Sequence, residues 1–230
     1  MDLAPGKTAG TRDASLDADR ENFEIRARIL QVVYAALDDL PFDKVSVSLI
    51  CERAGISRPT FYRYFTDRND VCNWFIRTTM RSSLNQIGIV FSWQEGLVRF
   101  CRVMDANCDL AAAFLADRRP FSPYDLLMTA LEDVLIANAL TRGADGDDRE
   151  IAFQARGFSR AFAGALVDWL AEGGSVGIPI ERFAELSCAL APRRLFDLLD
   201  APTAGGAYSE AFRRAADRTP LIEFVPEPTR

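Results

Sequence analysis

Helical periodicity is the feature of this sequence that most constrains its fold. Apolar side chains recur at three- and four-residue steps along most of the chain, and the alternation typical of β-strands is scarce. The first such stripe predicts a helix over 21–40 that ends at Pro41. Because this helical periodicity dominates, the chain is predicted to be all-α, and a hydrophobic content of 49% is sufficient for a buried core.

Two short helical segments separated by a glycine follow this stripe. Ser46 is a candidate N-cap for a helix over 47–54, and Gly55 interrupts the pattern after it. Ser57 can cap the next helix, and Pro59 falls in its first turn, where the missing N–H costs nothing. Two short helices joined by a tight, glycine-containing turn are typical of the helix-turn-helix, whose second helix enters the major groove of DNA.

The string CERAGISRPTFYRYF at 51–65 closely resembles the signature of the TetR family, and the resemblance covers roughly residues 28–75. It implies a homodimer with an N-terminal three-helix DNA-binding domain and a C-terminal helical domain that binds a small effector and dimerises. Carried over by position, three residues would face base edges: Arg58, Pro59 and Thr60. Those that would contact phosphates or support the two helices are Ser46, Ser48, Ser57, Tyr62, Tyr64 and Arg68.

Simpler interpretations of these residues stay open. Arg58 could be a solvated helix residue, and Tyr62 and Tyr64 could be packing aromatics. Pro41 stands where the family usually has glycine, so the turn after the first helix must differ. The string PFDK at 41–44 is similar to a branch of the family that includes regulators of dihydroxyacetone kinase genes. The expectation is a repressor. Because some members of that branch activate transcription, the alternative is an activator or a co-regulator that acts through a partner protein.

The charge of the chain argues against a nucleic-acid partner until its distribution is considered. The net charge is −6 and the pI is about 4.9, whereas affinity for phosphate requires lysine and arginine. Between residues 53 and 68, however, four arginines stand against the single acid Asp67. A basic face on an acidic protein can still dock on double-stranded DNA while the remainder of the surface suppresses non-specific contact.

The C-terminal half holds a pool of aromatic and soft residues and a stripe with coiled-coil-like spacing over 151–169. Each set has two interpretations, one of which is the chain's own core. The residues expected to line a largely apolar effector pocket are Trp93, Phe100, Met104, Phe114, Phe158 and Phe162. Those expected at a dimer interface are Phe158, Ala161, Phe162, Ala165, Trp169, Phe183, Leu186 and Leu190.

Enzymatic chemistry finds little support in the composition. The chain has no histidine, which removes the usual general base, the Ser-His-Asp triad and most zinc sites, and GxSxG, P-loop and GxGxxG motifs are absent. We therefore expect no catalysis, metal or cofactor. Five cysteines without a CxxC pair and an N-terminus unlike an export signal lead us to expect reduced thiols and a location in the cytoplasm. No stretch reaches ~18 consecutive apolar residues, so no membrane-spanning helix is expected.

The predicted organisation has four parts. A flexible arm at 1–20, polar and unlike a secretion signal, precedes the helix-turn-helix domain at 21–68. A helical effector and dimerisation domain follows at 69–200, and a loosely held tail at 201–230.

Overall fold

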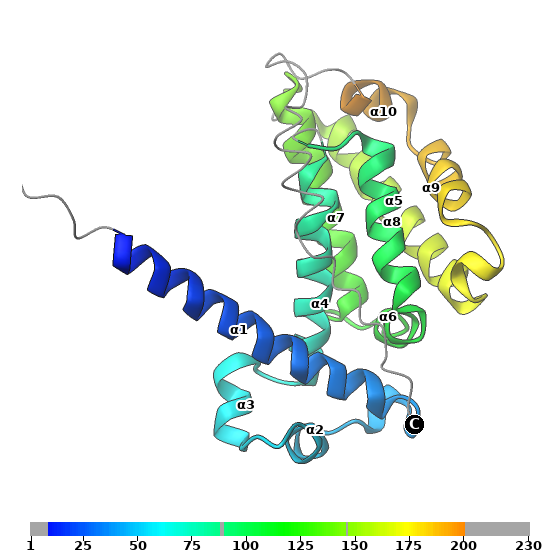
Figure 1. Ribbon diagram of the computed structural model, residues 1–230. Helices are drawn as coiled ribbons and strands as arrows, with labels where there is room; N and C mark the ends of the chain where they lie inside the picture. Colours follow the sequence, from blue (N-terminus) through cyan, green and yellow to red (C-terminus); the bar gives the residue numbers. More distant parts are fainter. Residues whose placement is uncertain (1–8, 88–89, 146, 201–230) are drawn as a thin grey trace, which may run out of the picture. The chain divides into compact units, whose positions relative to one another are not determined.

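A computed structural model describes residues 9–87, 90–145 and 147–200, and the chain divides into two compact units, Met1–Val71 and Cys72–Arg230. Helices make up the fold of both units (Figure 1). Within the described ranges, strand-type pairing is limited to one isolated bridge between Ile87 and Phe91. The all-α prediction is therefore confirmed. The predicted tail at 201–230 lies outside the described residues.

The first unit contains the elements predicted for the DNA-binding domain. Its elements are α1 (Ala9–Ala36), η1 (Phe42–Lys44), α2 (Val47–Ala54), α3 (Arg58–Tyr64) and the first turn of α4 (Arg68–Ser82). Its core is formed by side chains that are fully or almost fully buried, namely Ile29, Leu30, Val33, Val45, Ile50, Phe61 and Phe65.

Helix α1 differs from the predicted 21–40 helix at both ends. It begins at Ala9, so residues 9–20 are helical rather than part of a flexible arm. This segment has no apolar stripe and so gave no periodic signal, but its alanine, leucine and arginine residues have high helix propensity. The helix ends at Ala36, and residues 37–39 form a turn before Leu40, which the following proline disfavours as a helical residue.

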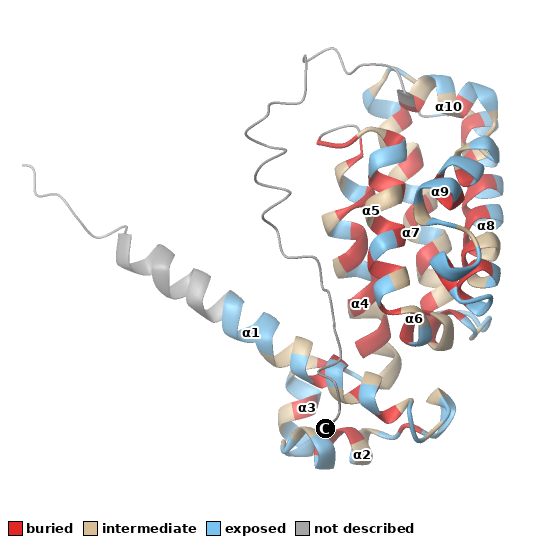
Figure 2. Ribbon diagram, turned by 45° about the vertical axis from the view of Figure 1, so that its right-hand side comes forward, coloured by how far each residue is buried: buried red, intermediate tan, exposed pale blue. Residues whose placement is uncertain are grey.

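The second unit is a bundle of packed helices with a continuous buried interior (Figure 2). After the rest of α4 its elements are η2 (Leu84–Gln86), α5 (Trp93–Ala106), α6 (Cys108–Leu115), α7 (Pro123–Thr141), α8 (Arg149–Ala171), η3 (Gly174–Val176), α9 (Ile180–Ala189) and α10 (Arg193–Asp200). Helix α7 packs along α8, and α5 packs against α9. Helix α6 lies against α8, while α10 contacts both α7 and α8.

Aromatic and other apolar side chains fill this interior, and they include all six residues predicted to line an effector pocket. Trp93, Phe100, Met104, Phe114, Phe158 and Phe162 are each at most 2% exposed. The rings of Phe158 and Phe162 are stacked with centroids 6.1 Å apart, and Phe158 also meets Trp93 at 5.5 Å. The structure thus places the six in the core of the unit, because the apolar stripe of a helix in a bundle faces its own neighbours first.

The residues predicted for the dimer interface fall into a buried group and an exposed group. Four of its large residues are buried within the chain itself, namely Phe158, Phe162, Trp169 and Phe183. The rings of Trp169 and Phe183 are stacked at 4.5 Å, and the Trp169 indole N–H donates to the Ile178 carbonyl at 2.8 Å. Ala165 is half-buried, whereas Ala161, Leu186 and Leu190 are exposed.

None of the described helices combines the length and apolar character needed to cross a membrane.

Candidate nucleic-acid interface

The turn between α2 and α3 is built from the capping residues that the sequence indicated. Ser46 caps α2 by accepting a hydrogen bond from the Leu49 N–H at 3.2 Å. At the other end Gly55 has φ +64, in the left-handed region that glycine adopts without strain. The N–H groups of Gly55 and Ile56 donate to carbonyls of the last turn, at 3.2 and 3.0 Å. These bonds end α2 sharply and direct the chain into α3.

Helix α3 buries one side and leaves its leading end in solvent. Ser57 caps the helix by accepting from the Thr60 N–H at 3.2 Å, and Pro59 occupies the first turn. Phe61 is fully buried, whereas Arg58 and Pro59 are exposed. The end of the helix that a major groove would receive is therefore accessible.

A guanidinium at this leading end connects the two helices. The Arg58 Nη1 donates to the Ser48 Oγ on α2 at 3.3 Å, and its Nη2 donates to the Tyr62 Oη one turn along α3 at 3.4 Å. The hydrogen bond to Tyr62 raises the pKa of Arg58 above its ordinary value. Arg58 thus remains a full positive charge beside two hydroxyl groups.

The other predicted contact residues have different surroundings. The hydroxyls of Ser57 and Thr60 lie 2.8 Å apart and hydrogen bond to each other. Tyr64 is half-buried, and the Arg63 guanidinium lies over its ring at 5.3 Å from the centroid. Tyr62 is 49% exposed and meets the ring of Phe61 edge-on.

Arg68 differs from the expected phosphate contact. Its Nη1 lies within hydrogen-bond distance of three carbonyl oxygens, those of Phe42 at 3.2 Å, Asp43 at 2.6 Å and Val45 at 3.0 Å. The guanidinium also lies over the Phe42 ring at 5.1 Å. These contacts show that Arg68 stabilises the η1 turn. The sequence pattern could not predict this role, because the turn is 23 to 26 residues away along the chain.

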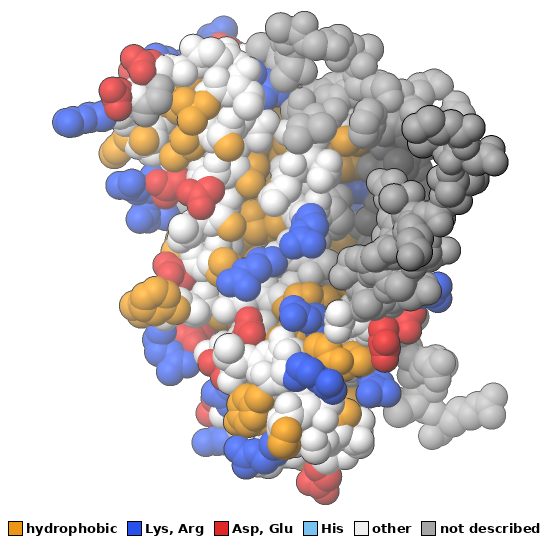
Figure 3. All heavy atoms as spheres, turned by 90° about the vertical axis from the view of Figure 1, so that its left-hand side faces the viewer, with side chains coloured by type: hydrophobic (Ala, Val, Ile, Leu, Met, Phe, Trp, Pro, Cys, Tyr) orange, Lys and Arg blue, Asp and Glu red, His pale blue; other side chains and the backbone are white. Residues whose placement is uncertain are grey.

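The arginines between residues 53 and 68 are not equivalent as positive charges. Arg53 forms an ion pair with Asp39 at 2.9 Å, and Arg68 is directed at backbone carbonyls. Arg58 contacts hydroxyls and Arg63 an aromatic ring, and both are exposed. In Figure 3 the Lys and Arg side chains of the face shown are interspersed with hydrophobic and acidic ones.

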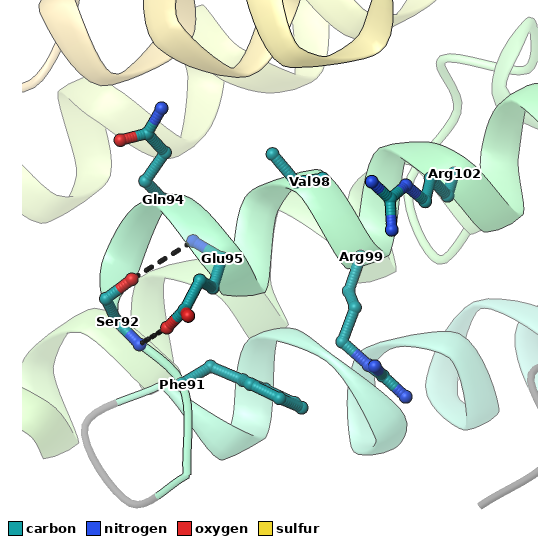
Figure 4. Close-up of a pocket in the computed structure, with 7 residues that line it drawn as sticks. All are labelled: Phe91, Ser92, Gln94, Glu95, Val98, Arg99 and Arg102. Atoms are coloured by element: carbon teal, nitrogen blue, oxygen red, sulfur yellow. Dashed lines mark hydrogen bonds between the residues drawn. The ribbon is translucent and has the colours of Figure 1, made fainter. Parts of the chain in front are cut away.

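The second unit has a cavity of about 560 Å³ on the solvent-facing side of α5 (Figure 4). Its lining comes from one helix and the residues before it, namely Phe91, Ser92, Gln94, Glu95, Val98, Arg99 and Arg102. Ser92 and Glu95 form a reciprocal capping box at the start of α5, and the Arg99 guanidinium lies over the Phe91 ring at 4.8 Å. None of the six residues predicted for the effector pocket lines this cavity, and the two arginines make it more polar than expected.

Residues 33–72 match the family model described as bacterial regulatory proteins, tetR family. Among curated relatives, the HTH-type dhaKLM operon transcriptional activator DhaS of Lactococcus lactis subsp. lactis is 28% identical over 34% of this chain and 43% of its own length. The HTH-type transcriptional regulator SAB2452 of Staphylococcus aureus is 27% identical over 29% of this chain and 36% of its own length. The chain thus spans less than half the length of these two relatives in the matched regions. A solved structure of the dihydroxyacetone kinase operon activator DhaS aligns over 73% of this chain and 96% of that chain, with a TM-score of 0.52 and 20% identity.

Proposed function

We propose that the chain is a TetR-type transcriptional regulator that binds a near-palindromic DNA site as a homodimer and responds to a small ligand. The match of residues 33–72 to the tetR family model and the similarity to DhaS support this proposal. The observation that carries the proposal is the exposed leading end of α3, where Ser57 caps the helix and Arg58 stands free of the core. In a two-fold dimer, two such helices would enter successive major grooves about one turn of DNA apart.

The contacts divide into base-reading and backbone groups. Arg58, Pro59 and Thr60 at the start of α3 would face base edges, where an arginine selects guanine by a bidentate contact. Tyr62 and Tyr64 would donate their hydroxyls to phosphates. Ser46, the N-cap of α2, and Ser48 in its first turn are both exposed and would lie at the flanking DNA backbone.

Selection of bound sequences from a random DNA pool, followed by footprinting on the selected site, tests this proposal. We expect a near-palindrome, with affinity that falls as salt rises. Arg58→Ala should abolish the protected footprint. The matched control is Arg193→Ala, which removes an exposed arginine from α10 and should leave the footprint unchanged. Equal protection by the wild type and Arg58→Ala would contradict the proposal.

We place the homodimer interface on the exposed side of α8. Phe153 is 76% exposed there, and Gly157 and Ala161 follow it on the same side at helical spacing. A Cβ added at Gly157 would meet nothing within 4 Å, so a second helix has room to approach closely. Leu186 and Leu190 of α9 are further exposed apolar side chains of the predicted interface. Sedimentation of Phe153→Asp should show a monomer where the wild type is a dimer, and a dimeric variant would refute this placement.

We propose that the ligand binds in the α5 cavity. Phe91 and Val98 offer apolar surface, whereas Arg99 and Arg102 favour an anionic group such as a carboxylate. Arg102 also pairs with Glu181 of α9 at 3.0 Å, so a ligand that takes this arginine would alter the α5–α9 contact. A thermal-shift screen of small organic acids should find compounds that stabilise the wild type but not Arg102→Ala. Arg193→Ala, which should respond like the wild type, is the control.

The sign of regulation has two candidates. Repression requires only that the dimer occupy a site that overlaps a promoter. Activation through a partner protein is favoured by the name of the DhaS relative, an operon transcriptional activator, and by the net charge of −6, which weakens binding to DNA alone. A reporter placed behind the selected DNA site separates them, because deletion of the gene raises expression in the first case and lowers it in the second.

A further inference from the structure

The Arg58 guanidinium is held at two of its nitrogens by residues of two different helices. Nη1 donates to the Ser48 Oγ at 3.3 Å and Nη2 to the Tyr62 Oη at 3.4 Å. Ser48 belongs to α2 and Tyr62 to α3, so the arrangement spans the turn between the two helices. The three side chains are all exposed.

Arg58, Ser48 and Tyr62 keep enough free donors to bind DNA without breaking the hydrogen bonds between them. A guanidinium has five N–H donors, and one used on each terminal nitrogen leaves a second on each, together with the Nε–H. Each hydroxyl accepts from Arg58 through a lone pair and keeps its own proton. That proton can be donated to a phosphate oxygen while the oxygen still holds the arginine.

The partners of Arg58 distinguish it from its neighbours. Arg53 pairs with the carboxylate of Asp39, and Arg68 is directed at carbonyls of the η1 turn. The partners of Arg58 are neutral hydroxyls, which fix the plane of the guanidinium without cancelling its charge. An arginine already fixed in place loses less side-chain freedom when it contacts a base.

We propose that Ser48 and Tyr62 are positioning residues that hold Arg58 for bidentate recognition of one guanine in each half-site. This rests on the proposed function, since it requires that α3 enter the major groove. It adds that recognition of that guanine depends on three residues together, and that the hydroxyl of Tyr62 links base recognition to a neighbouring phosphate.

The experiment measures the affinity of each variant for the selected DNA site and for a panel of its single base-pair substitutions. The variants are Arg58→Ala, Ser48→Ala, Tyr62→Phe and the matched control Tyr64→Phe, each verified as folded by its thermal unfolding. We expect Ser48→Ala and Tyr62→Phe to lose discrimination at the same base pair as Arg58→Ala, by about two- to tenfold for each lost hydrogen bond. Tyr64→Phe should lower affinity evenly across the panel.

A coupling measurement completes the test. In the Arg58→Ala background, Tyr62→Phe should have no further effect at that base pair, because the residue it positions has gone. A Tyr62→Phe protein that keeps the full guanine preference and loses affinity evenly, with a weaker salt dependence, would show a phosphate contact alone and overturn the proposal. A wild-type protein without any sequence preference would overturn the proposed function as well, so the two failures are distinguishable.

Discussion

Asp105 accepts two hydrogen bonds from Ser175, one from its backbone N–H and one from its hydroxyl, each 2.7 Å long. The pair joins the end of α5 to η3, which lies 70 residues further along the chain. Gly174 is part of the same arrangement, because its φ is +61 and a Cβ at this position would collide with the Asp105 carboxylate. The contact between α5 and η3 therefore depends on three residues: Asp105 as acceptor, Ser175 as donor, and Gly174, whose missing side chain leaves room for the carboxylate.

Asp105→Ala should destabilise the second unit by about 1 kcal/mol, since it removes two hydrogen bonds at a partly exposed site. Urea unfolding followed by tryptophan fluorescence measures the change. Asp105→Asn is the matched control, because it keeps one carbonyl oxygen as acceptor and should lose less. Identical unfolding midpoints for the wild type and the alanine variant would show that the junction contributes nothing.

Gly55→Ala should destabilise the first unit by about 1 kcal/mol, although a Cβ there meets no atom within 4 Å. The cost arises from φ +64 alone. Gly55→Asn should cost less, because asparagine tolerates the left-handed region better than alanine. Hydrogen exchange at the amides of α2 reports on this unit directly. If alanine and asparagine cost the same, backbone conformation is not the cause.

Arg68→Ala should lower the stability of the first unit by about 1–2 kcal/mol, since the η1 carbonyls lose a charged donor. The salt dependence of DNA binding should keep its slope, because the structural contacts of Arg68 are within the chain. Loss of a phosphate contact would instead reduce the slope by about one. Arg68→Lys, which keeps the charge but lacks the planar fork, should be intermediate in stability.

The thiols of Cys101 and Cys108 should react slowly with iodoacetamide in the native protein near neutral pH. Burial raises the pKa of both thiols, so each remains protonated where an ordinary cysteine begins to ionise, and the thiolate is the nucleophile. Raising the pH through the ordinary value should leave Cys101 unmodified until the chain unfolds. Mass spectrometry with and without urea measures this, and rapid native labelling of Cys101 would contradict it.

Local chemistry made the helix-turn-helix predictable from the sequence. Ser46, Gly55, Ser57 and Pro59 each act on backbone groups within a few residues, so their positions in the chain determine the caps and the turn. The contact between Arg58 and Ser48 could not be predicted in this way, because it depends on the angle at which α2 and α3 cross.

The second unit was harder to predict, because an apolar stripe does not reveal what it faces. Phe158, Phe162 and Trp169 have the spacing of an interface, yet they are buried against α5 and α9 of the same chain. The exposed Phe153 lies outside that stripe, and its isolation in the sequence gave no periodic signal. The cavity on α5 depends on side chains that face away from the core, where periodicity carries no information.

The fastening of η1 by Arg68 has a mechanical consequence. Arg68 is the first residue of α4, and the carbonyl of Val45 that it binds immediately precedes Ser46, the cap of α2. Arg68 therefore links the start of α4 directly to the start of α2. A change in the tilt of the first turn of α4 would displace the start of α2, and this coupling does not involve helix α1.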